Sequence, residues 1–355
     1  MAMSNNPNLR KIAEDWDEEY YRSRPELSYS QLSKYAREGF NGYLSLNEHI
    51  DTPSLAFGSA LDCMLTDGMD SFQKKYFASD SVLQESKSKS VIDFLASMSN
   101  ATCLDDIPMR TWEQAFEHVD FYSNLKTTSK LDKFKSNGVF DSKFTDYYKV
   151  VKSKGEKILI SNNTLDKLFD CKKSIKSHKV CRHWFIGDMP FGENEVYYQL
   201  KFKATFEGVG YRCMADAILV DHKSKKIYPL DLKTTSKQVY EFYKSFIEWR
   251  YDIQARLYWR IINSCVKHSK DFKDYTVMNY TFAVVNSSLC NTMSWVFSET
   301  KDKGTLVYGK NKDIILEDPF ELGKELKYLI DSNAICPLGT SFTENNNLTS
   351  FLKKM

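Results

Sequence analysis

Three runs of alternating apolar and polar residues lie close together between positions 195 and 233. Each run is rich in the β-branched and aromatic residues that favour strands. Short turns of Gly, Asp, Lys and Ser residues separate the runs, so neighbouring runs can pair as an antiparallel meander. The expected strands are 195–206, 211–220 and 226–233. This part of the chain therefore restricts the fold to one built on a sheet.

The segments on either side of the meander predict helices and two further strands. We expect helices at 28–36, 53–67, 237–249, 252–265 and 319–330, and strands at 276–286 and 291–298. Residues 80–185 have a mostly helical and polar pattern. Strands grouped in one region and helices in others are typical of an α+β fold.

The composition excludes several classes of protein. The chain has 355 residues, with 49 Lys and Arg against 47 Asp and Glu and a net charge of +2, so it is not a polybasic binder. No run approaches the roughly 18 apolar residues of a membrane span, and the polar first residues do not resemble a signal peptide. The 8 cysteines are scattered without a CxxC pair, which argues against structural zinc and an iron–sulfur cluster. We expect a soluble cytoplasmic protein.

Charged residues inside the predicted meander indicate a site. Asp231 and Lys233 are two residues apart on an apolar strand, so their side chains leave the same face. Asp216 lies at the matching depth of the preceding strand, between two alanines. Converging carboxylates suit Mg²⁺, which takes oxygen ligands, and Mn²⁺ is an alternative. A lysine beside such an ion suits phosphodiester hydrolysis, in which water is activated and negative charge develops.

Each of these residues also has a plainer interpretation. An acid two residues before a lysine recurs along the chain, at Glu85, Asp141, Asp170, Asp221, Asp271, Glu299 and Glu325 as well as at Asp231. Asp231 and Lys233 could form a structural ion pair of the strand. The apolar strand, the upstream Asp216 and the helix that follows separate this match from the others.

A set of motifs resembles one nuclease superfamily. Asp216, the run Asp231-Leu232-Lys233-Thr234-Thr235 and the helix Tyr251-Asp252-Ile253-Gln254-Ala255-Arg256-Leu257-Tyr258 resemble the PD-(D/E)xK superfamily, in its RecB-like branch. The similarity is greatest to the exonuclease VIII (RecE) type, which the runs 28–32 and 57–62 also fit. The resemblance implies a restriction-endonuclease-like core, a mixed sheet flanked by helices, with an N-terminal helical part and a helical insert.

The resemblance also implies a domain layout. Residues 1–27 would be an acidic N-terminal arm and residues 28–300 the nuclease domain, with the helical insert at about 75–185. Residues 301–355 would form a C-terminal helical extension.

The resemblance implies a role for each matching residue. Asp216 and Asp231 would be metal ligands together with the Leu232 carbonyl, and Lys233 would orient or activate the attacking water. Gln254 and Tyr258 lie one helical turn apart and would position the scissile phosphate or a terminal nucleotide, although a plain amphipathic helix would show the same spacing. Glu195 would be a further metal ligand, with Glu193 as the alternative in register. The plainer interpretation of Glu195 is a solvent-facing strand residue.

One position departs from the family pattern. Asp62 stands where family members usually carry a metal-approaching histidine, four residues after Gly58. An aspartate can ligate Mg²⁺, so Asp62 is a candidate ligand. The change could equally alter the preferred metal or weaken the enzyme.

The function implied is an Mg²⁺-dependent exonuclease acting on double-stranded DNA ends in recombination, in a bacterial or phage-infected cell. A single-strand annealing protein as partner and a ring-shaped homo-oligomer fit that type. Two alternatives stay open: a structure-specific or Cas-type endonuclease on the same fold, and a non-catalytic DNA-binding protein on an eroded nuclease fold.

Overall fold

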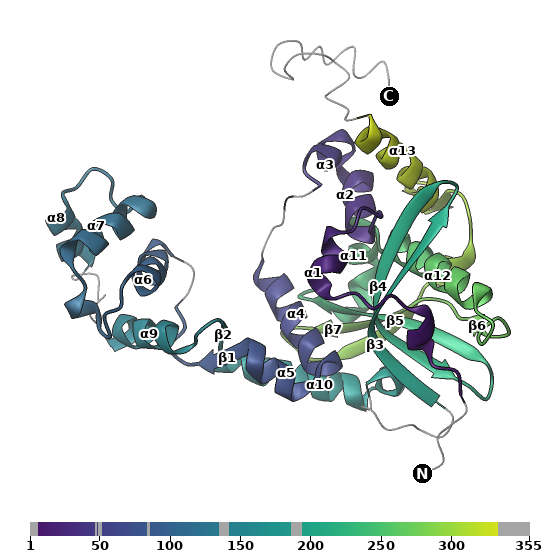
Figure 1. The fold of residues 1–355 in the computed structure, drawn as a ribbon, viewed down its shortest axis with the longest axis horizontal. Coiled ribbons are helices and arrows are strands. Elements are labelled where there is room, and N and C mark those ends of the chain that lie inside the picture. The colour runs from purple at the N-terminus through teal and green to yellow at the C-terminus, as the bar shows by residue number, and fades with distance from the viewer. Residues whose placement is uncertain are drawn as a thin grey trace. The chain divides into compact units, whose positions relative to one another are not determined.

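The computed structural model describes residues 6–46, 48, 52–83, 86–134, 142–185 and 194–332. The chain divides into two compact units (Figure 1). The first unit comprises Met1–Ser54 and Ser174–Met355, and the second comprises Leu55–Lys173. The expected insert of about 75–185 therefore differs from the second unit at both ends, and this unit also contains the run 57–62.

The first unit is built on a mixed sheet with the strand order β3-β4-β5-β7-β8, and β6 also pairs with β5. Strands β3, β4 and β5 form an antiparallel meander, β7 runs parallel to β5, and β8 is antiparallel to β7. The strands are β3 (Asn194–Phe206), β4 (Val209–Asp221), β5 (Lys226–Thr235), β6 (Thr276–Val277), β7 (Thr281–Asn286) and β8 (Thr292–Val296). The expected α+β class and mixed sheet are confirmed.

The turn between β3 and β4 shows why the meander could be predicted. Its two central residues, Glu207 and Gly208, have φ angles of 52° and 83°. Positive φ at both positions is the geometry of a type I′ turn, whose twist matches that of the flanking strands. Phe206 pairs directly with Val209 across it. The short turn therefore sets the register of the hairpin.

Helices pack on this sheet around one hydrophobic core (Figure 1). Helix α12 (Tyr251–His268) buries Ile253, Leu257 and Ile261, whose spacing places them on one helical face. Ser28 and Gln31 form a capping box at the start of α2. Further helices of this unit are α2 (Tyr29–Glu38), α3 (Phe40–Leu44), α11 (Phe242–Glu248) and α13 (Pro319–Asp331), with the 3-10 turns η4 (Cys181–Trp184), η5 (Val239–Glu241) and η6 (Ser298–Lys301).

The second unit is mostly helical, as the pattern of residues 80–185 predicts. It has a separate hydrophobic core, in which Val91, Trp112, Phe116, Phe134 and Tyr148 are buried. Its elements are α4 (Pro53–Thr66), α5 (Gly68–Lys75), β1 (Tyr76–Ser79), α6 (Lys87–Met98), α7 (Met109–His118), α8 (Thr127–Phe134), α9 (Ser142–Ser153), β2 (Ile158–Ser161) and α10 (Asn162–Ser177). The parallel pair β1 and β2 was not expected.

The described part of the expected N-terminal arm packs on the sheet. It contains η1 (Leu9–Ile12) and α1 (Glu18–Ser23). Leu9 and Leu27 are 0% and 1% exposed, and the backbone of Glu14 bridges to Lys201 on β3. Single apolar residues in an acidic segment have no periodicity, so no local pattern predicted this packing.

One expected strand is corrected. The strand expected at 276–286 is divided into β6 and β7. Ile227 of β5 pairs with Val277, 50 positions later, whereas Leu230 of β5 pairs with Thr281, 51 positions later. The segment from β6 to β7 therefore has one residue more than the facing part of β5, which is a bulge. Pro229 lies opposite the bulge and lacks the N–H group of a regular ladder.

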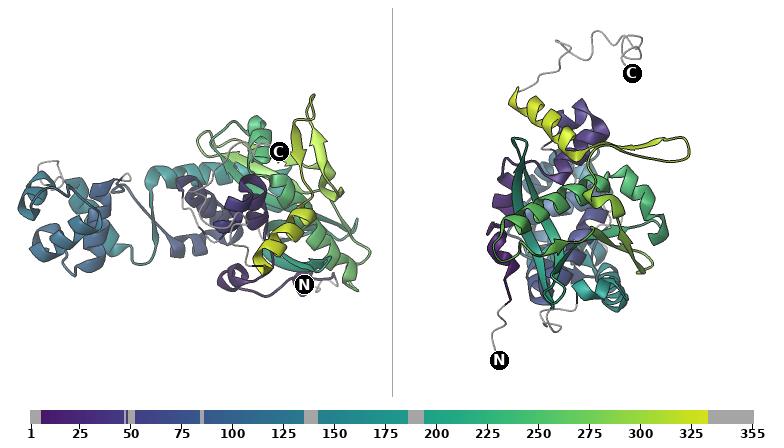
Figure 2. Two further views of the ribbon diagram at one scale, coloured as in Figure 1. Left: turned by 90° about the horizontal axis from the view of Figure 1, so that it is seen from above. Right: turned by 90° about the vertical axis from the view of Figure 1, so that its right-hand side faces the viewer.

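The described part of the C-terminal extension is not wholly helical. It contains a hairpin of β9 (Leu306–Tyr308) and β10 (Ile314–Leu316) before α13 (Figure 2). Within the part of the chain that the structure describes, no helix is both long and apolar enough to cross a membrane.

Candidate metal and phosphodiester site

Asp216 and Asp231 lie where strands β4 and β5 separate. The ladder between these strands ends at the pair Ala217–Leu230, and the next positions in register are the two aspartates. The backbone N–H of Leu232 donates a 2.8 Å hydrogen bond to Asp216 Oδ2. This bond joins the two strands beyond the end of the ladder, so the structure brings both carboxylates to one place.

The backbone opposite Asp216 is irregular. Tyr198 pairs with Ala217 and Leu200 with Ala215, so Gln199 on β3 is in register with Asp216. Gln199 has a φ of 52°, a left-handed conformation uncommon in residues other than glycine. Such strain often marks a functional site.

The Asp231 carboxylate is 2% exposed and has two side-chain neighbours. Gln254 Nε2 donates a hydrogen bond to its Oδ1. Lys233 Nζ lies 2.6 Å from its Oδ2. This second contact is an ion pair without hydrogen-bond geometry, because Oδ2 has no hydrogen-bond partner among the described residues. One lysine charge therefore offsets the burial of one carboxylate.

Lys233 is held between this carboxylate and an aromatic ring. Its side chain is 18% exposed, and its Nζ lies 4.6 Å from the centroid of the Tyr251 ring. Burial by itself would lower the pKa of Lys233, but the Asp231 carboxylate and the neighbouring tyrosines raise this pKa above its ordinary value. The ammonium group is therefore protonated at neutral pH, which suits orienting a water or a phosphate oxygen better than removing a proton.

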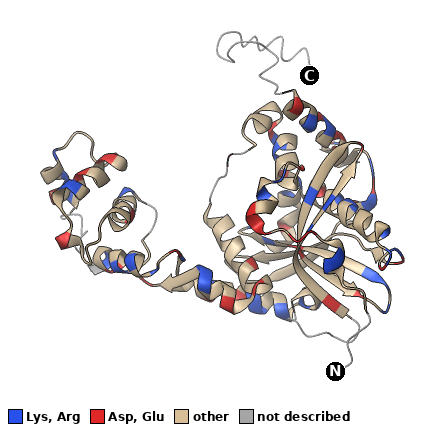
Figure 3. Cartoon of the chain, viewed as in Figure 1, with Lys and Arg blue, Asp and Glu red and all other residues tan. Residues whose placement is uncertain are grey.

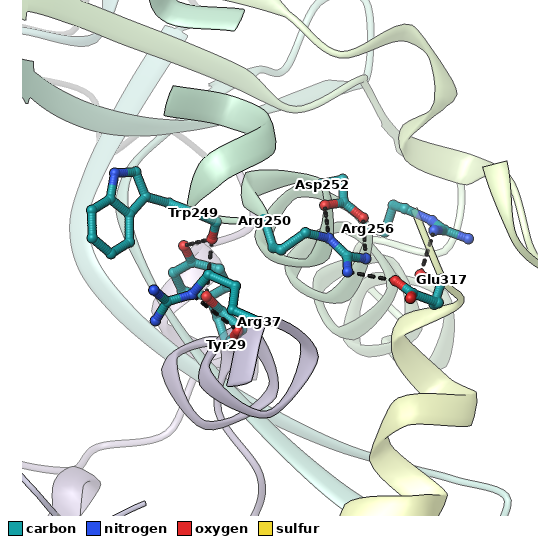
Figure 4. Close-up of polar contacts among 8 residues, drawn as sticks. Tyr29, Arg37, Trp249, Arg250, Asp252, Arg256 and Glu317 are labelled. Carbon is teal, nitrogen blue, oxygen red and sulfur yellow. Dashed lines mark hydrogen bonds and ion pairs between the residues drawn. The ribbon is translucent and has the colours of Figure 1, made fainter. Parts of the chain in front are cut away.

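An ion-pair network anchors the start of helix α12, which carries Gln254. Arg250 adopts a left-handed conformation with a φ of 54° at the N-cap. Its guanidinium donates to Asp252, which is 0% exposed, and to Glu317 (Figure 4). Arg256 Nη1 donates to the Glu317 carbonyl at 3.2 Å. These contacts tie the start of α12 to Glu317, in the segment between β10 and α13.

Helix α2 is joined to the same region through the Trp249 carbonyl. This oxygen accepts hydrogen bonds from the Tyr29 hydroxyl at 2.8 Å and from Ser33 Oγ at 2.9 Å (Figure 4). The Tyr29 and Tyr251 ring centroids are 6.1 Å apart. Burial and then Tyr251 raise the pKa of Tyr29, and Lys233 opposes the shift. The run 28–32 therefore contributes a tyrosine near Lys233.

Tyr258 lies one turn after Gln254 and is 7% exposed. Burial raises the pKa of the Tyr258 phenol well above its ordinary value, and the Asp231 and Asp216 carboxylates act in the same direction. Tyr258 is therefore mostly out of solvent, on the same face of α12 as Gln254.

Glu195 lies away from the two aspartates. It pairs with Val220, four residues along β4 from Asp216, a separation of about 13 Å on an extended strand. Its Oε2 accepts a hydrogen bond from the Tyr197 hydroxyl and lies 3.4 Å from His222 Nε2. The structure therefore does not bring Glu195 to the site. Glu193 lies outside the described residues.

Asp62 lies on α4 in the second unit, whereas the aspartate pair lies in the first. The Asp62 carbonyl accepts a hydrogen bond from Thr66 Oγ1 within the helix. Ligation by Asp62 stays a prediction.

Asp216 and Asp231 fit a hard divalent cation. In the described ranges no three His, Cys, Asp or Glu side chains come together as a metal cluster. Mg²⁺ does not need such a cluster, because it usually takes one or two carboxylates and fills its other positions with water and phosphate oxygens. Among the described residues the buried Asp231 Oδ2 has no hydrogen-bond partner, and the Leu232 N–H already donates to Asp216. Asp216, Asp231 and the Leu232 carbonyl are therefore a suitable oxygen set.

Two participants were missed although their motifs were recognised. Tyr29 belongs to the run 28–32 and Tyr251 to the motif 251–258, yet no role was assigned to either. Both surround the Lys233 ammonium. The aromatic residue in each motif was the sequence signal that could have identified them. The contact between Gln254 and Asp231 was also not foreseen, because spacing alone gives no partner.

Comparisons with known proteins do not assign a family. No family model matches this sequence, and no curated protein matches it. One solved structure with similarity is described as "Putative exonuclease" from Eubacterium rectale. The two chains are 11% identical, with a TM-score of 0.43, and the match covers 96% of this chain and 100% of that chain. Similarity at this level is too low to carry an argument about fold or activity.

Proposed function

We propose that this protein is a metal-dependent nuclease that hydrolyses phosphodiester bonds in DNA. The observation that carries the proposal is the arrangement around Asp231. Its buried carboxylate contacts Lys233 and Gln254, and the Leu232 N–H ties the same strand to Asp216. Two carboxylates and a protonated lysine at a strand separation suit the charge changes of phosphodiester hydrolysis.

The metal would be Mg²⁺, with Mn²⁺ as a substitute, held by Asp216, Asp231 and the Leu232 carbonyl. When bound, it would lower the pKa of a water molecule and offset the charge on the phosphate. Lys233 would then exchange its contact with Asp231 Oδ2 for one with the attacking water or a phosphate oxygen. Gln254 would keep Asp231 oriented through the bond to Oδ1.

The proposed substrate is linear double-stranded DNA, digested from its ends. This follows from the sequence resemblance to exonuclease VIII type nucleases. Basic and acidic residues are interspersed along both units (Figure 3), so DNA would be held by local contacts and not by a uniformly positive surface. A recombination role, an annealing partner and a ring-shaped oligomer belong to the same proposal.

The test is digestion of linear and circular duplex DNA with Mg²⁺, Mn²⁺ or EDTA. Wild type is compared with Lys233→Ala, and with Lys237→Ala as a matched control whose lysine pairs with the exposed Glu248. We expect wild type to digest linear but not circular DNA when metal is present. The Lys233→Ala variant should digest neither.

Other results point elsewhere. Cleavage of circles would favour the endonuclease alternative. Absence of cleavage with either metal, together with DNA binding, would favour the eroded, non-catalytic alternative.

A further inference from the structure

A fully buried tyrosine lies beside the aspartate pair and has no assigned role. Tyr280 is 0% exposed, and its hydroxyl has no hydrogen-bond partner among the described residues. Leaving a phenol hydroxyl buried and unpaired is costly, so such groups call for an explanation. Asp231 Oδ2 and Gln254 Oε1 are likewise buried without a hydrogen-bond partner in the part of the chain that the structure describes.

The bulge in the 276–286 strand places Tyr280 there. Tyr280 directly precedes β7, whose Phe282 is in register with Asp231. Its ring lies 5.4 Å from the Phe282 ring and 6.0 Å, edge to face, from that of Tyr258. A bulge redirects a side chain relative to a regular strand, and bulges are frequent beside active sites. The ring therefore lies between β7 and the part of α12 that carries Gln254 and Tyr258.

The charges around Tyr280 agree with this position. Burial raises the pKa of the Tyr280 phenol well above its ordinary value, and the Asp231 carboxylate is the next largest cause. The hydroxyl is therefore protonated at neutral pH and is a hydrogen-bond donor with no acceptor among the described side chains and backbone groups.

The unpaired atoms are complementary. Gln254 Nε2 donates to Asp231 Oδ1, which leaves Oε1 of the same amide as an acceptor without a donor. Asp231 Oδ2 is already held by Lys233. If the amide turned over, Oε1 would face a carboxylate, and the two oxygens would repel each other. A donor on Oε1 would oppose that rotation.

We propose that Tyr280 is a positioning residue whose hydroxyl donates a hydrogen bond to a bridging water, which donates in turn to Gln254 Oε1 and so holds Nε2 of the amide on Asp231. Its role deepens the proposed function, because it sets the orientation of a metal-ligating carboxylate without touching the substrate. Hydrogen-bond partners of this kind typically change metal affinity or activity about 10–100-fold when removed.

The experiment is a double-mutant cycle of Tyr280→Phe and Gln254→Ala in the full chain. Two quantities are measured for the four proteins: the melting temperature without metal, and the affinity for Mg²⁺ alone by calorimetry. Tyr211→Phe is the matched control, since Tyr211 is equally buried and donates only a 3.4 Å hydrogen bond to the Phe320 carbonyl.

We expect Tyr280→Phe to lower the melting temperature by about 2–4 °C and to weaken Mg²⁺ binding about 10–100-fold. In the Gln254→Ala background the same substitution should change neither quantity. Tyr211→Phe should leave Mg²⁺ binding unchanged.

Additive effects would overturn the proposal, since Tyr280 would then act on Asp231 or the core independently of Gln254. An unchanged Tyr280→Phe protein would overturn it as well. The metal-free cycle separates this inference from the proposed function. Coupled melting temperatures in a protein that binds no Mg²⁺ would support the link between Tyr280 and Gln254 and contradict the nuclease.

Discussion

Burial of the Asp231 carboxylate at 2% exposure carries a large desolvation penalty. The Lys233 ammonium and the Gln254 amide offset that penalty. Each of these residues thus has a structural role in the metal-free protein and a chemical role in the proposed reaction. The plainer interpretation, a structural ion pair of the strand, describes the metal-free protein as well. Stability and activity therefore have to be measured together.

Replacing Lys233 by methionine removes the charge and keeps most of the side-chain volume. The Asp231 carboxylate would be left buried without its cation, which costs about 3–5 kcal/mol of unfolding free energy. Denaturant unfolding measures the loss. Lys237→Met is the control, because its ion pair with Glu248 is exposed and should contribute little. Equal, small losses in both variants would show that the buried pair does not stabilise the fold.

The stability from this pair should depend on pH in one direction. The folded protein raises the pKa of Lys233 above the ordinary lysine value of about 10.4, so it holds this proton more tightly than the unfolded chain. The contribution of the ion pair to the unfolding free energy is complete below the ordinary lysine pKa. It declines as pH rises through the higher pKa of Lys233 in the folded protein. Wild type should exceed Lys233→Met by the same unfolding free energy from about pH 7 to about pH 9. A difference that shrinks within that range would contradict the assignment.

At the scale of elements, helix α12 and strand β5 have to be aligned for Gln254 to reach Asp231. Arg250 begins the helix and bonds both the buried Asp252 and Glu317, which lies between β10 and α13. The anchor therefore links the helix to a segment 67 positions later in the chain. Sequence spacing predicted that Gln254 and Tyr258 share one face of the helix. The packing of α12 decides that this face points toward Asp231.

Arg250→Ala should destabilise the first unit by about 3–5 kcal/mol, since the buried Asp252 carboxylate loses its partner. It should also lower DNA cleavage at temperatures where the protein is still folded, because α12 would shift relative to β5. Unfolding and cleavage are followed in parallel. Arg22→Ala, which breaks an exposed pair with Glu18, serves as the control. Full cleavage by a destabilised Arg250→Ala protein would show that the anchor does not position the site.

The elements that could be predicted are those with strong local signals. Alternation was enough to place β3 and β4, although β4 begins at Val209 and not at the expected residue 211, and apolar spacing was enough to place α12. The bulge before Tyr280 and the packing of Leu9 depend on distant partners, which no local pattern encodes. For the same reason Glu195 was placed near Asp216 in expectation, although its register sets it apart.

At the scale of the whole molecule, the two units have separate hydrophobic cores. The site residues Asp216, Asp231, Lys233 and Gln254 all belong to the first unit, whereas Asp62 belongs to the second. The similarity of motifs spans both units, but the geometry that supports the proposed chemistry is complete within one.

Separate cores predict separate effects of core mutations. Trp112→Ala should remove a buried side chain from the second unit at a cost of about 3–5 kcal/mol. Thermal unfolding should then show a lower first transition, while Mg²⁺ binding below that transition stays at the wild-type level. Phe282→Ala in the first unit is the counterpart and should weaken Mg²⁺ binding. Loss of Mg²⁺ binding in folded Trp112→Ala protein would instead implicate the second unit, and Asp62 with it.

Asp231 is proposed to hold a catalytic divalent cation. The most direct measurement is the rate of linear duplex DNA cleavage across a Mg²⁺ titration, for wild type and for Asp231→Asn. Asparagine keeps the shape and removes the charge. We predict saturable, Mg²⁺-dependent cleavage by wild type and a loss of at least about 100-fold in the variant at every Mg²⁺ concentration. Equal rates for the two proteins, or cleavage that persists in EDTA, would contradict the account.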